Sequence, residues 1–310
     1  MRILLVVNAR SGRGRGNAAA NRLGSLLAAH HVSRVDIPRD PRRDFQWLSP
    51  KLHEAELCVI VGGDGTLHGV LPALVESRVP VFHAATGTEN LFARQFGSFD
   101  RDVDRVGAKL LAALRSPRVL RVDVARASGL EQTDRYFSLM LSAGPDASVI
   151  SRLSRVRTGA ISHWSYLKPI AAEAADPYLP IVDVRVDGVS LCAPGPGLLL
   201  IANARQYALR IDPAPEASMT DGELDVLFVP ATGSFSLIRA MTRSRLGFPS
   251  STIIRTRGRQ IRFTLTGRPH QHAVQADGEA LSLSASSNET IEGAIEVLPA
   301  ALGVIEVPLG

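Results

Sequence analysis

The feature that most constrains the fold is a short apolar run that ends in a glycine cluster. Residues 57–61 are all apolar, and Gly62-Gly63-Asp64-Gly65-Thr66 follows directly and opens an amphipathic segment at 66–76. The apolar run predicts a buried strand. Glycines let the backbone turn tightly and approach a ligand closely, and the N–H groups at a helix start favour phosphate. We therefore expect a phosphate-binding loop here; the alternative is a strand–turn–helix connection that binds nothing.

The first third of the chain repeats this order of strand and helix. Strands that alternate with helices form a parallel sheet, which binds ligands at the carboxyl ends of its strands. We therefore expect residues 1–120 to form a Rossmann-like α/β domain with a parallel sheet. The predicted strands are 3–7, 32–37, 57–61 and 80–83, the predicted helices are 17–29, 44–53, 66–76 and 102–114, and a glycine-rich loop occupies 8–16.

The pattern changes after Pro117, where most segments alternate like half-buried strands. Pairs such as Asp187-Gly188, Asp221-Gly222 and Asp277-Gly278 are typical of hairpin turns. We expect residues 121–298 to form a mainly antiparallel β-sandwich domain. The predicted strands are 119–126, 136–142, 181–186, 198–203, 224–229, 252–256, 260–265, 273–276 and 295–298; one helical segment contains Arg152, Arg155 and Arg157, and a second spans 162–175.

Composition narrows the class of protein. The chain has 310 residues, 45% of them apolar, and a net charge of +5 that arginine supplies, since lysine occurs only at positions 51, 109 and 168. A basic surface suits nucleic acid, anionic lipid or a phosphorylated ligand, and an arginine-rich solvated surface with no partner is equally consistent. No run of about 18 apolar residues occurs, so no membrane span is predicted, and the N-terminus does not resemble a signal peptide. Cys58 and Cys192 are expected in the core, unpaired, as in a cytoplasmic protein.

A dinucleotide-binding fingerprint is a competing interpretation of the first loop. Gly14-Arg15-Gly16-Asn17-Ala18-Ala19 follows a predicted strand, and Asp36 ends the next one, as in NAD-binding dehydrogenases. This interpretation leaves the loops at 62–66 and 87–90 without a role, whereas a nucleotide held by its phosphates uses all three. No P-loop sequence occurs.

Three further polar clusters are candidates for chemistry. Gly87-Thr88-Glu89-Asn90 follows a predicted strand, so its side chains bind phosphate or ribose oxygens or only cap a helix. Asp221-Gly222-Glu223-Leu224-Asp225 offers oxygen ligands for a hard cation or forms a plain turn. Asp277-Gly278-Glu279 is a turn or delivers a general base. The eight histidines show no metal-ligand spacing.

Taken in order, these motifs resemble the catalytic domain of diacylglycerol kinases, in its bacterial lipid kinase form. Asn8-Ala9-Arg10-Ser11-Gly12 is similar to the family's Asn-Pro-x-Ser-Gly opening, and 142–147 and 298–302 also match. The resemblance covers essentially the whole chain. Its main motifs are Gly62-Gly63-Asp64-Gly65-Thr66, Gly87-Thr88-Glu89-Asn90-Leu91-Phe92-Ala93-Arg94, Asp221-Gly222-Glu223-Leu224-Asp225 and Asp277-Gly278-Glu279.

The resemblance implies a two-domain kinase with ATP and Mg²⁺ in the cleft between the domains. Glu279 would accept the proton of the lipid hydroxyl and Asp64 would organise Mg²⁺ and the phosphates; the alternative, with Asp64 as the general base, stays open. A second Mg²⁺ would be held by the Ser218 carbonyl, Asp221 and Glu223. Phosphoryl transfer needs charge neutralisation, alignment and one base. The implied nucleotide-binding residues are Asn8, Ser11, Gly12, Gly62, Gly63, Asp64, Gly65, Thr66, Gly87, Thr88 and Asn90.

The resemblance also implies the partners. The acceptor would be the hydroxyl of diacylglycerol or a related lipid at a membrane surface, met by a cytoplasmic protein working peripherally at the inner membrane face. No nucleic acid partner is implied, and a homodimer stays open. The segment 299–310 would return to the α/β domain.

Three departures from the family pattern keep alternatives open. His68-Gly69 stands where the family usually has Asn-Glu, Ala208-Leu209-Arg210 replaces a glycine triplet, and Ala85-Thr86 replaces Pro-Leu. The alternatives are a small-molecule kinase similar to NAD kinase, which also uses a Gly-Gly-Asp-Gly loop, and a non-catalytic protein that binds nucleotide or lipid.

Overall fold

The structure, a computed structural model, describes residues 1–38, 47–145, 147–148, 179–205, 213–233, 236–237, 239, 253–267, 272–283 and 290–308. The chain forms two compact units, each described here by itself. We call Met1–Val122 with Ala300–Gly310 the α/β unit, and Asp123–Pro299 the β unit. Two strands, β5 (Val119–Ser128) and β16 (Thr290–Ile305), each begin in one unit and end in the other.

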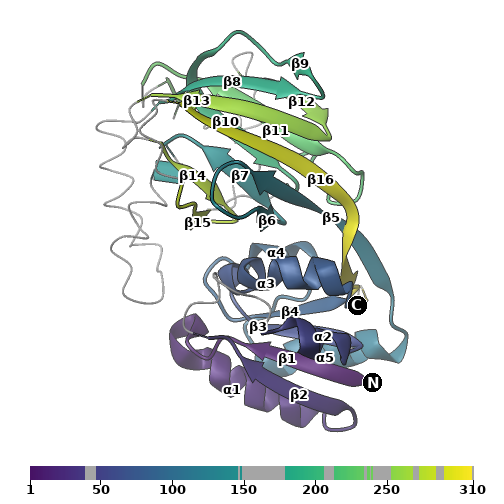
Figure 1. Ribbon diagram of the computed structural model, residues 1–310. Coiled ribbons are helices and arrows are strands. Elements are labelled where there is room, and N and C mark those ends of the chain that lie inside the picture. The colour runs from purple at the N-terminus through teal and green to yellow at the C-terminus, as the bar shows by residue number, and fades with distance from the viewer. Residues whose placement is uncertain are drawn as a thin grey trace. The chain divides into compact units, whose positions relative to one another are not determined.

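The α/β unit is built on a parallel sheet (Figure 1). Its strands lie in the order β4-β3-β1-β2, and each neighbouring pair is parallel. The end of β16 adds to β4, where Val304 pairs in parallel with Val81. Every residue of β3 and β4 is buried, as expected of parallel strands covered on both faces. The bounds are β1 (Arg2–Val7), β2 (His31–Asp36), β3 (Leu57–Gly62) and β4 (Val81–Ala85).

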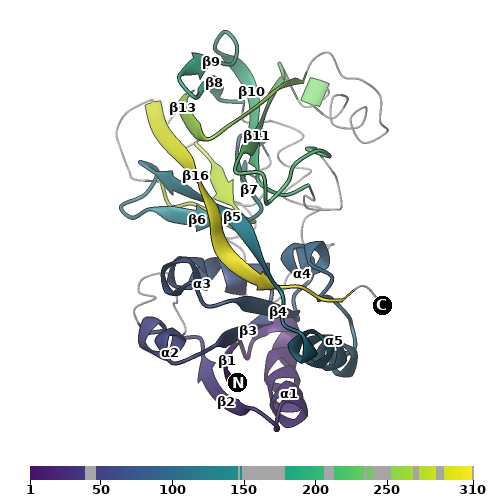
Figure 2. The same cartoon turned by 90° about the vertical axis from the view of Figure 1, so that its right-hand side faces the viewer.

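Helices cover both faces of this sheet. α1 packs beside α5 and α2 beside α3, and the two pairs lie on opposite faces (Figure 2). Leu23 and Leu110 join Val59 and Phe82 in the core between the sheet and the first pair; burying each such side chain contributes about 1.5–3 kcal/mol. The bounds are α1 (Ser11–Leu26), α2 (Ser49–His53), α3 (Asp64–Ser77), α4 (Leu91–Gln95) and α5 (Val103–Arg115).

α1 begins earlier than predicted. The sequence predicts a loop up to residue 16 and a helix from 17, whereas α1 begins at Ser11. Gly12 and Gly14 have φ of +60° and +87°, which glycine adopts without strain. At Gly16 a Cβ atom would lie 2.1 Å from the carbonyl oxygen of Asn8, so this glycine lets the helix start directly against the end of β1.

The β unit contains two sheets of antiparallel strands. One runs β6-β5-β16-β13-β8-β9 and the other β15-β14-β7-β10-β11-β12, and β10 also pairs with β8 at two positions. The pairs with a defined register within the unit are all antiparallel. The bounds are β6 (Arg135–Phe137), β7 (Met140–Ala143), β8 (Ile181–Val186), β9 (Val189–Ser190), β10 (Gly195–Ala202), β11 (Leu224–Pro230), β12 (Ile254–Gly258), β13 (Gln260–Thr266), β14 (Val274–Ala276) and β15 (Glu279–Ala280).

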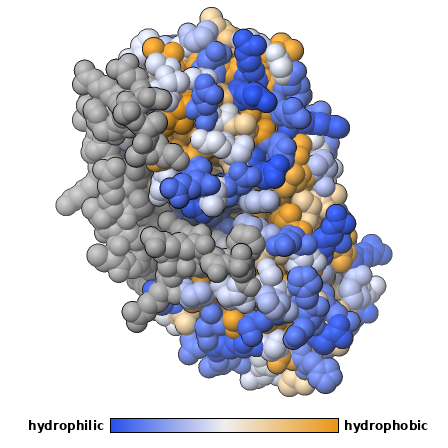
Figure 3. All heavy atoms as spheres, viewed as in Figure 1, coloured by the Kyte–Doolittle hydropathy of each residue, from blue (hydrophilic) through white to orange (hydrophobic). Residues whose placement is uncertain are grey.

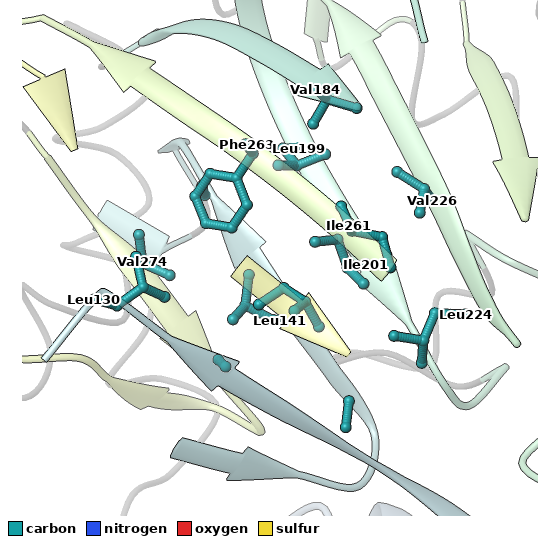
Figure 4. Close-up of a cluster of buried hydrophobic side chains, with 14 of the residues drawn as sticks. Leu130, Leu141, Val184, Leu199, Ile201, Leu224, Val226, Ile261, Phe263 and Val274 are labelled. Carbon is teal, nitrogen blue, oxygen red and sulfur yellow. The ribbon is translucent and has the colours of Figure 1, made fainter. Parts of the chain in front are cut away.

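Apolar residues of both sheets belong to one buried core (Figure 4). Val184 and Phe263 come from the first sheet, and Leu141, Leu199 and Val226 come from the second. A core shared by two antiparallel sheets is the arrangement of a β-sandwich. The predicted fold class, a Rossmann-like α/β domain and a mainly antiparallel β-sandwich domain, is confirmed.

One predicted strand is interrupted by a side chain. The sequence predicts a single strand at 136–142, whereas β6 and β7 are separated by Ser138 and Leu139. The N–H groups of Ser138, Leu139 and Met140 donate to the carboxylate of Asp277 at 2.8, 2.8 and 3.0 Å. Because these N–H groups donate to the Asp277 side chain and not to a neighbouring strand, the strand is interrupted between β6 and β7.

β16 is much longer than the predicted strand at 295–298. Its buried residues alternate from Ile291 to Val297, but Gly293 and Pro299 obscure this pattern in the sequence because both are uncommon inside strands. Asp221-Gly222 is not a two-residue hairpin turn: it leads into β11, which pairs with β10, but β10 already ends at Ala202. The Asp187-Gly188 and Asp277-Gly278 pairs do connect paired strands, with positive φ at all four residues, as type I′ turns require.

Three segments singled out in the sequence fall outside the described residues. They are the segment with Arg152, Arg155 and Arg157, the helix predicted at 162–175, and residues 208–210.

The predictions on cysteines and membrane spans can be compared with the structure. Cys58 is buried, Cys192 is only half-buried between β9 and β10, and neither forms a disulfide. In the part of the chain that the structure describes, no helix is both long and apolar enough to cross a membrane. Hydrophilic residues predominate over the α/β unit on the face in Figure 3.

The packing of Gly293 against Phe263 predicts a change in stability. A Cβ atom at Gly293 would lie 2.5 Å from Cζ of Phe263, and this ring is only 2% exposed, so it has little space to move into. Gly293→Val should lower the free energy of unfolding by about 1–3 kcal/mol, the usual cost of overpacking, as measured by urea denaturation.

Ala294→Val is the matched control. Residue 294 lies half-buried on the opposite face of β16, where a β-branched side chain suits a strand, so its stability should stay within about 0.5 kcal/mol of the wild type. Equal stability of the two variants would show that the Phe263 ring does not fill the space above Gly293.

Candidate active site

Three loops of the α/β unit meet where β1, β3 and β4 end. The Thr86 N–H donates to the Gly62 carbonyl at 2.8 Å, and a Cβ on Gly87 would lie 2.8 Å from Cα of Gly63. A Cβ on Gly12 would lie 2.3 Å from the Thr86 carbonyl oxygen. The loops therefore pack backbone against backbone, which requires glycine at these positions.

Side-chain hydrogen bonds join the same loops. Asn8 Nδ2 donates to Thr66 Oγ1 at 3.0 Å, and Thr86 Oγ1 donates to Ser11 Oγ at 2.9 Å. A Cβ on Gly62 would lie 2.3 Å from Thr66 Oγ1, so Gly62 makes room for the buried threonine. The loops and the helix starts that follow them carry every predicted nucleotide-binding residue: Asn8, Ser11, Gly12, Gly62, Gly63, Asp64, Gly65, Thr66, Gly87, Thr88 and Asn90.

Asp64 connects two of these loops through its carboxylate. It is the first residue of α3, and its Oδ2 and Oδ1 accept from the N–H groups of Leu91 at 3.0 Å and Phe92 at 3.1 Å. An ionised carboxylate has about four acceptor positions, so the remaining ones can still face a cation or donor. The structure thus gives Asp64 a positioning role that the sequence does not reveal, and its part in binding Mg²⁺ stays a prediction.

Asn90 combines a left-handed backbone with a buried oxygen. Its φ is +55°, and its Nδ2 donates to the Gly87 carbonyl at 3.0 Å. Its Oδ1 is buried and has no hydrogen-bond partner among the described residues. Because buried acceptors are normally satisfied, this oxygen fits a bound ligand that supplies a donor, such as a ribose hydroxyl or an adenine amine.

His83 lies in β4 and contacts the backbone of the glycine loop. Its Nε2 is 3.1 Å from the carbonyl oxygen of Gly62, so the proton of the neutral ring is on Nε2. Burial lowers the pKa of His83, while Asp64 and the Gly62 carbonyl partly oppose that shift. The neutral ring supports the loop, and protonation would place a charge in a desolvated position.

Glu279, the predicted proton acceptor, is held by a turn of the β unit. It follows Asp277-Gly278, where φ is +49° and +81°. Besides the three N–H groups described above, the Asp277 carboxylate accepts from Ser138 Oγ at 3.1 Å. Hydrogen bonds to a charged acceptor are stronger than neutral ones, so this turn fixes the backbone next to Glu279. Glu279 is itself half-buried.

The predicted site for a second metal lies in the β unit, ahead of β11. Asp221 Oδ1 accepts from the Glu223 N–H at 3.1 Å, and Ser218 Oγ lies 3.1 Å from Thr220 Oγ1. Among the described residues, no group of three or more His, Cys, Asp or Glu side chains could hold a metal ion. The metal-binding roles of Ser218, Asp221 and Glu223 stay predictions.

Two buried polar residues that the sequence analysis does not single out connect the link between β6 and β7 to the turn at Asp221-Gly222. Asn203 Nδ2 donates to the carbonyl oxygens of Asp123 and Ser138 at 2.8 Å each, and Asp123 Oδ2 accepts from the Gly222 N–H at 2.8 Å. Asp123 and Asn203 are 2% and 0% exposed. The available signal is Asn203 at the end of the otherwise apolar predicted strand 198–203; Asp123 gives none, because its predicted strand also contains Arg121 and Arg126.

The sequence matches two protein families over nearly its whole length. Residues 2–127 match the family described as "Diacylglycerol kinase catalytic domain", and residues 140–306, more than half of the chain, match the "YegS C-terminal NAD kinase beta sandwich-like domain". The chain belongs to the bacterial diacylglycerol kinase family. It is therefore a kinase with an alcohol group as acceptor, as predicted, and the dehydrogenase interpretation of the first loop is wrong.

Named relatives and solved structures agree with this assignment. Over 240 residues this kinase is 22% identical to proteins called diacylglycerol kinase from two strains of Mycobacterium tuberculosis, with 77% of this chain and 76% of theirs covered. The structure of a diacylglycerol kinase from Bacillus anthracis str. Sterne matches with a TM-score of 0.69 at 19% identity, over 99% of this chain and 97% of that one. Two further structures from that strain match with TM-scores of 0.73 and 0.74. At this identity the solved structures establish the fold.

The burial of His83 predicts a pH-dependent stability of this kinase. The unfolded state takes up a proton near pH 6.5, whereas the folded state resists protonation because the pKa is lowered. The stability from the neutral ring is therefore complete above about pH 6.5 and is lost as the pH falls, by up to about 2 kcal/mol at pH 5. In denaturant titrations at pH 7 and pH 5, His83→Gln should lose less stability than the wild type.

The control for this measurement is His53→Gln, which removes an exposed imidazole. It should keep the acid sensitivity of the wild type. An unchanged loss of stability in His83→Gln would show that other groups account for the acid sensitivity.

Proposed function

We propose that this kinase transfers the γ-phosphate of ATP to a hydroxyl of diacylglycerol or a related lipid. The observation that carries the proposal is the meeting of three glycine loops at the ends of β1, β3 and β4, in a chain of the diacylglycerol kinase family. Backbone-to-backbone packing at Gly63 and Gly87 leaves main-chain groups unobstructed by side chains, as a phosphate site needs.

The nucleotide has specific partners on these loops. Phosphates would lie against the start of α3, a helix of 14 residues, whose N-terminus carries a partial positive charge. The buried Oδ1 of Asn90 would accept from the ribose or the base. Asp64 holds the loop before α4 in place through Leu91 and Phe92, so the loops at 62–66 and 87–90 keep their spacing when the nucleotide enters.

Magnesium fits the residues present only in part. Mg²⁺ is commonly held by one or two carboxylates plus substrate phosphates, and it keeps several waters. Asp64 supplies such a carboxylate, with acceptor positions left over from its two backbone hydrogen bonds. When bound, the ion would neutralise phosphate charge during transfer. Asp64 would then have two tasks, to fix the loop and to face the ion.

Glu279 would act as the general base. Its carboxylate takes the proton of the lipid hydroxyl while that oxygen forms a bond to the γ-phosphorus, and the bond from the γ-phosphorus to the bridging oxygen breaks to release ADP. The hydrogen bonds of Asp277 hold the turn before Glu279, which limits the freedom of the base. The lipid would be met at a membrane surface, where the net charge of +5 favours anionic headgroups.

The roles of Asp64 and Glu279 are tested by substitution. Glu279→Gln should lower the kcat for lipid phosphorylation by about 10²–10⁴, the usual contribution of a positioned base, with little change in nucleotide affinity. Asp64→Asn should also abolish lipid-dependent consumption of radiolabelled ATP. Glu292→Gln, on the exposed face of β16, is the matched control and should keep full activity.

Circular dichroism should show that each variant is folded. Full activity of a folded Glu279→Gln or Asp64→Asn variant would remove that residue from the mechanism.

A small-molecule kinase is the second candidate, because the family matched by residues 140–306 is described as similar to the NAD kinase β-sandwich. Phosphorylation of NAD in preference to a mixed lipid extract would favour it. Tight ATP binding without turnover on either acceptor would instead favour a non-catalytic binding protein, an option motivated by His68-Gly69.

A further inference from the structure

Arg257 of β12 lies among the oxygen atoms of the segment predicted to hold a second Mg²⁺. Its Nη2 donates to the Glu216 carbonyl at 2.8 Å, and its Nε donates to Asp225 Oδ1 at 3.1 Å. Its Nη1 lies 3.9 Å from Asp221 Oδ2. One guanidinium group thus faces Glu216 at the start of this segment, Asp221 in its turn and Asp225 at its end.

The sheet register explains why the arginine is there. β11 and β12 are antiparallel, and Asp225 pairs directly with Arg257. Opposite charges at directly paired positions stabilise a sheet. The Asp225 side chain is only 16% exposed, and its Oδ1 accepts a hydrogen bond from Arg257 Nε. Arg257 therefore compensates a carboxylate that the fold places in a poorly solvated position.

The same contacts make the segment a poor fit for a divalent ion. Of the two Asp221 oxygens, Oδ1 accepts from the Glu223 N–H and Oδ2 faces Arg257. An ion bound to Asp221 would meet the positive charge of the guanidinium a few ångströms away, where repulsion is substantial. Mg²⁺ also demands a near-octahedral set of ligands, while these oxygens are arranged around a planar fork of donors, the geometry that arginine recognises.

We propose that Arg257 replaces the second metal ion in this protein: the guanidinium, and not Mg²⁺, bridges Glu216, Asp221 and Asp225. The segment before β11 would then keep its shape without a divalent ion. This inference concerns the β unit alone and stands whether or not the acceptor is a lipid.

Thermal unfolding of the nucleotide-free protein tests the proposal, in EDTA and in millimolar MgCl₂ at matched ionic strength. The wild type should have the same unfolding temperature in both. Arg257→Gln should unfold several degrees lower in EDTA, because it leaves carboxylates without their cation, and Mg²⁺ should restore part of the loss. Arg262→Gln, which removes an exposed arginine from β13, the next strand along the chain, is the control and should behave as the wild type does.

Two results would overturn the proposal. The first is a wild-type unfolding temperature that rises saturably with Mg²⁺ and loses this rise in Asp221→Asn; this comparison remains decisive even if Arg257→Gln fails to fold. The second is an Arg257→Gln variant as stable as Arg262→Gln in EDTA.

Discussion

The arrangement of the loops in the α/β unit depends on one close contact, between the backbones at Gly63 and Gly87. β3 and β4 are neighbours in a parallel sheet, so the loops that leave them start side by side. Without side chains at these two positions the loops can touch, and the Thr86 N–H then reaches the Gly62 carbonyl. Asp64 reaches the N–H groups of α4 for the same reason. A Cβ atom at Gly87 would lie 2.8 Å from Cα of Gly63, so a side chain there would push the loops apart and strain both connections.

The β unit positions its turns with polar side chains that are buried, as in Asp123 and Asn203, or half-buried, as in Asp277. Asp277 gathers four donors from the link between β6 and β7, and Asn203 and Asp123 tie that link to the turn before β11. Each such group is costly to bury unless it is satisfied; the Asn203 amide nitrogen donates twice, whereas its Oδ1 has no hydrogen-bond partner among the described residues. A network of this kind has few alternative arrangements, so the turns that carry Glu279 and Asp221 are attached to the core and do not depend on flexible loops.

Much of the fold and part of the site could be predicted from the sequence. Apolar runs predict buried strands such as 57–61, and Asp-Gly pairs predict the turns at 187–188 and 277–278. The early start of α1, the break at Ser138 and the length of β16 were missed, because each depends on a contact with a distant residue. The pairing of Asp225 with Arg257 needs the register of two strands, and the bonds from Asp64 to α4 need the spacing of two loops. A single sequence contains neither the strand register nor the loop spacing.

The continuity of β16 has a consequence for the order in which the protein can fold during synthesis. β4 finds a neighbour on its outer side only when Val304 arrives, after the whole β unit has left the ribosome. At a synthesis rate of about 5–20 residues per second, this edge of the α/β sheet stays unpaired for on the order of ten seconds. Such an edge can pair with other chains. A nascent chain stalled before residue 300 would therefore present a nearly complete α/β unit whose unpaired strand edge is prone to aggregation.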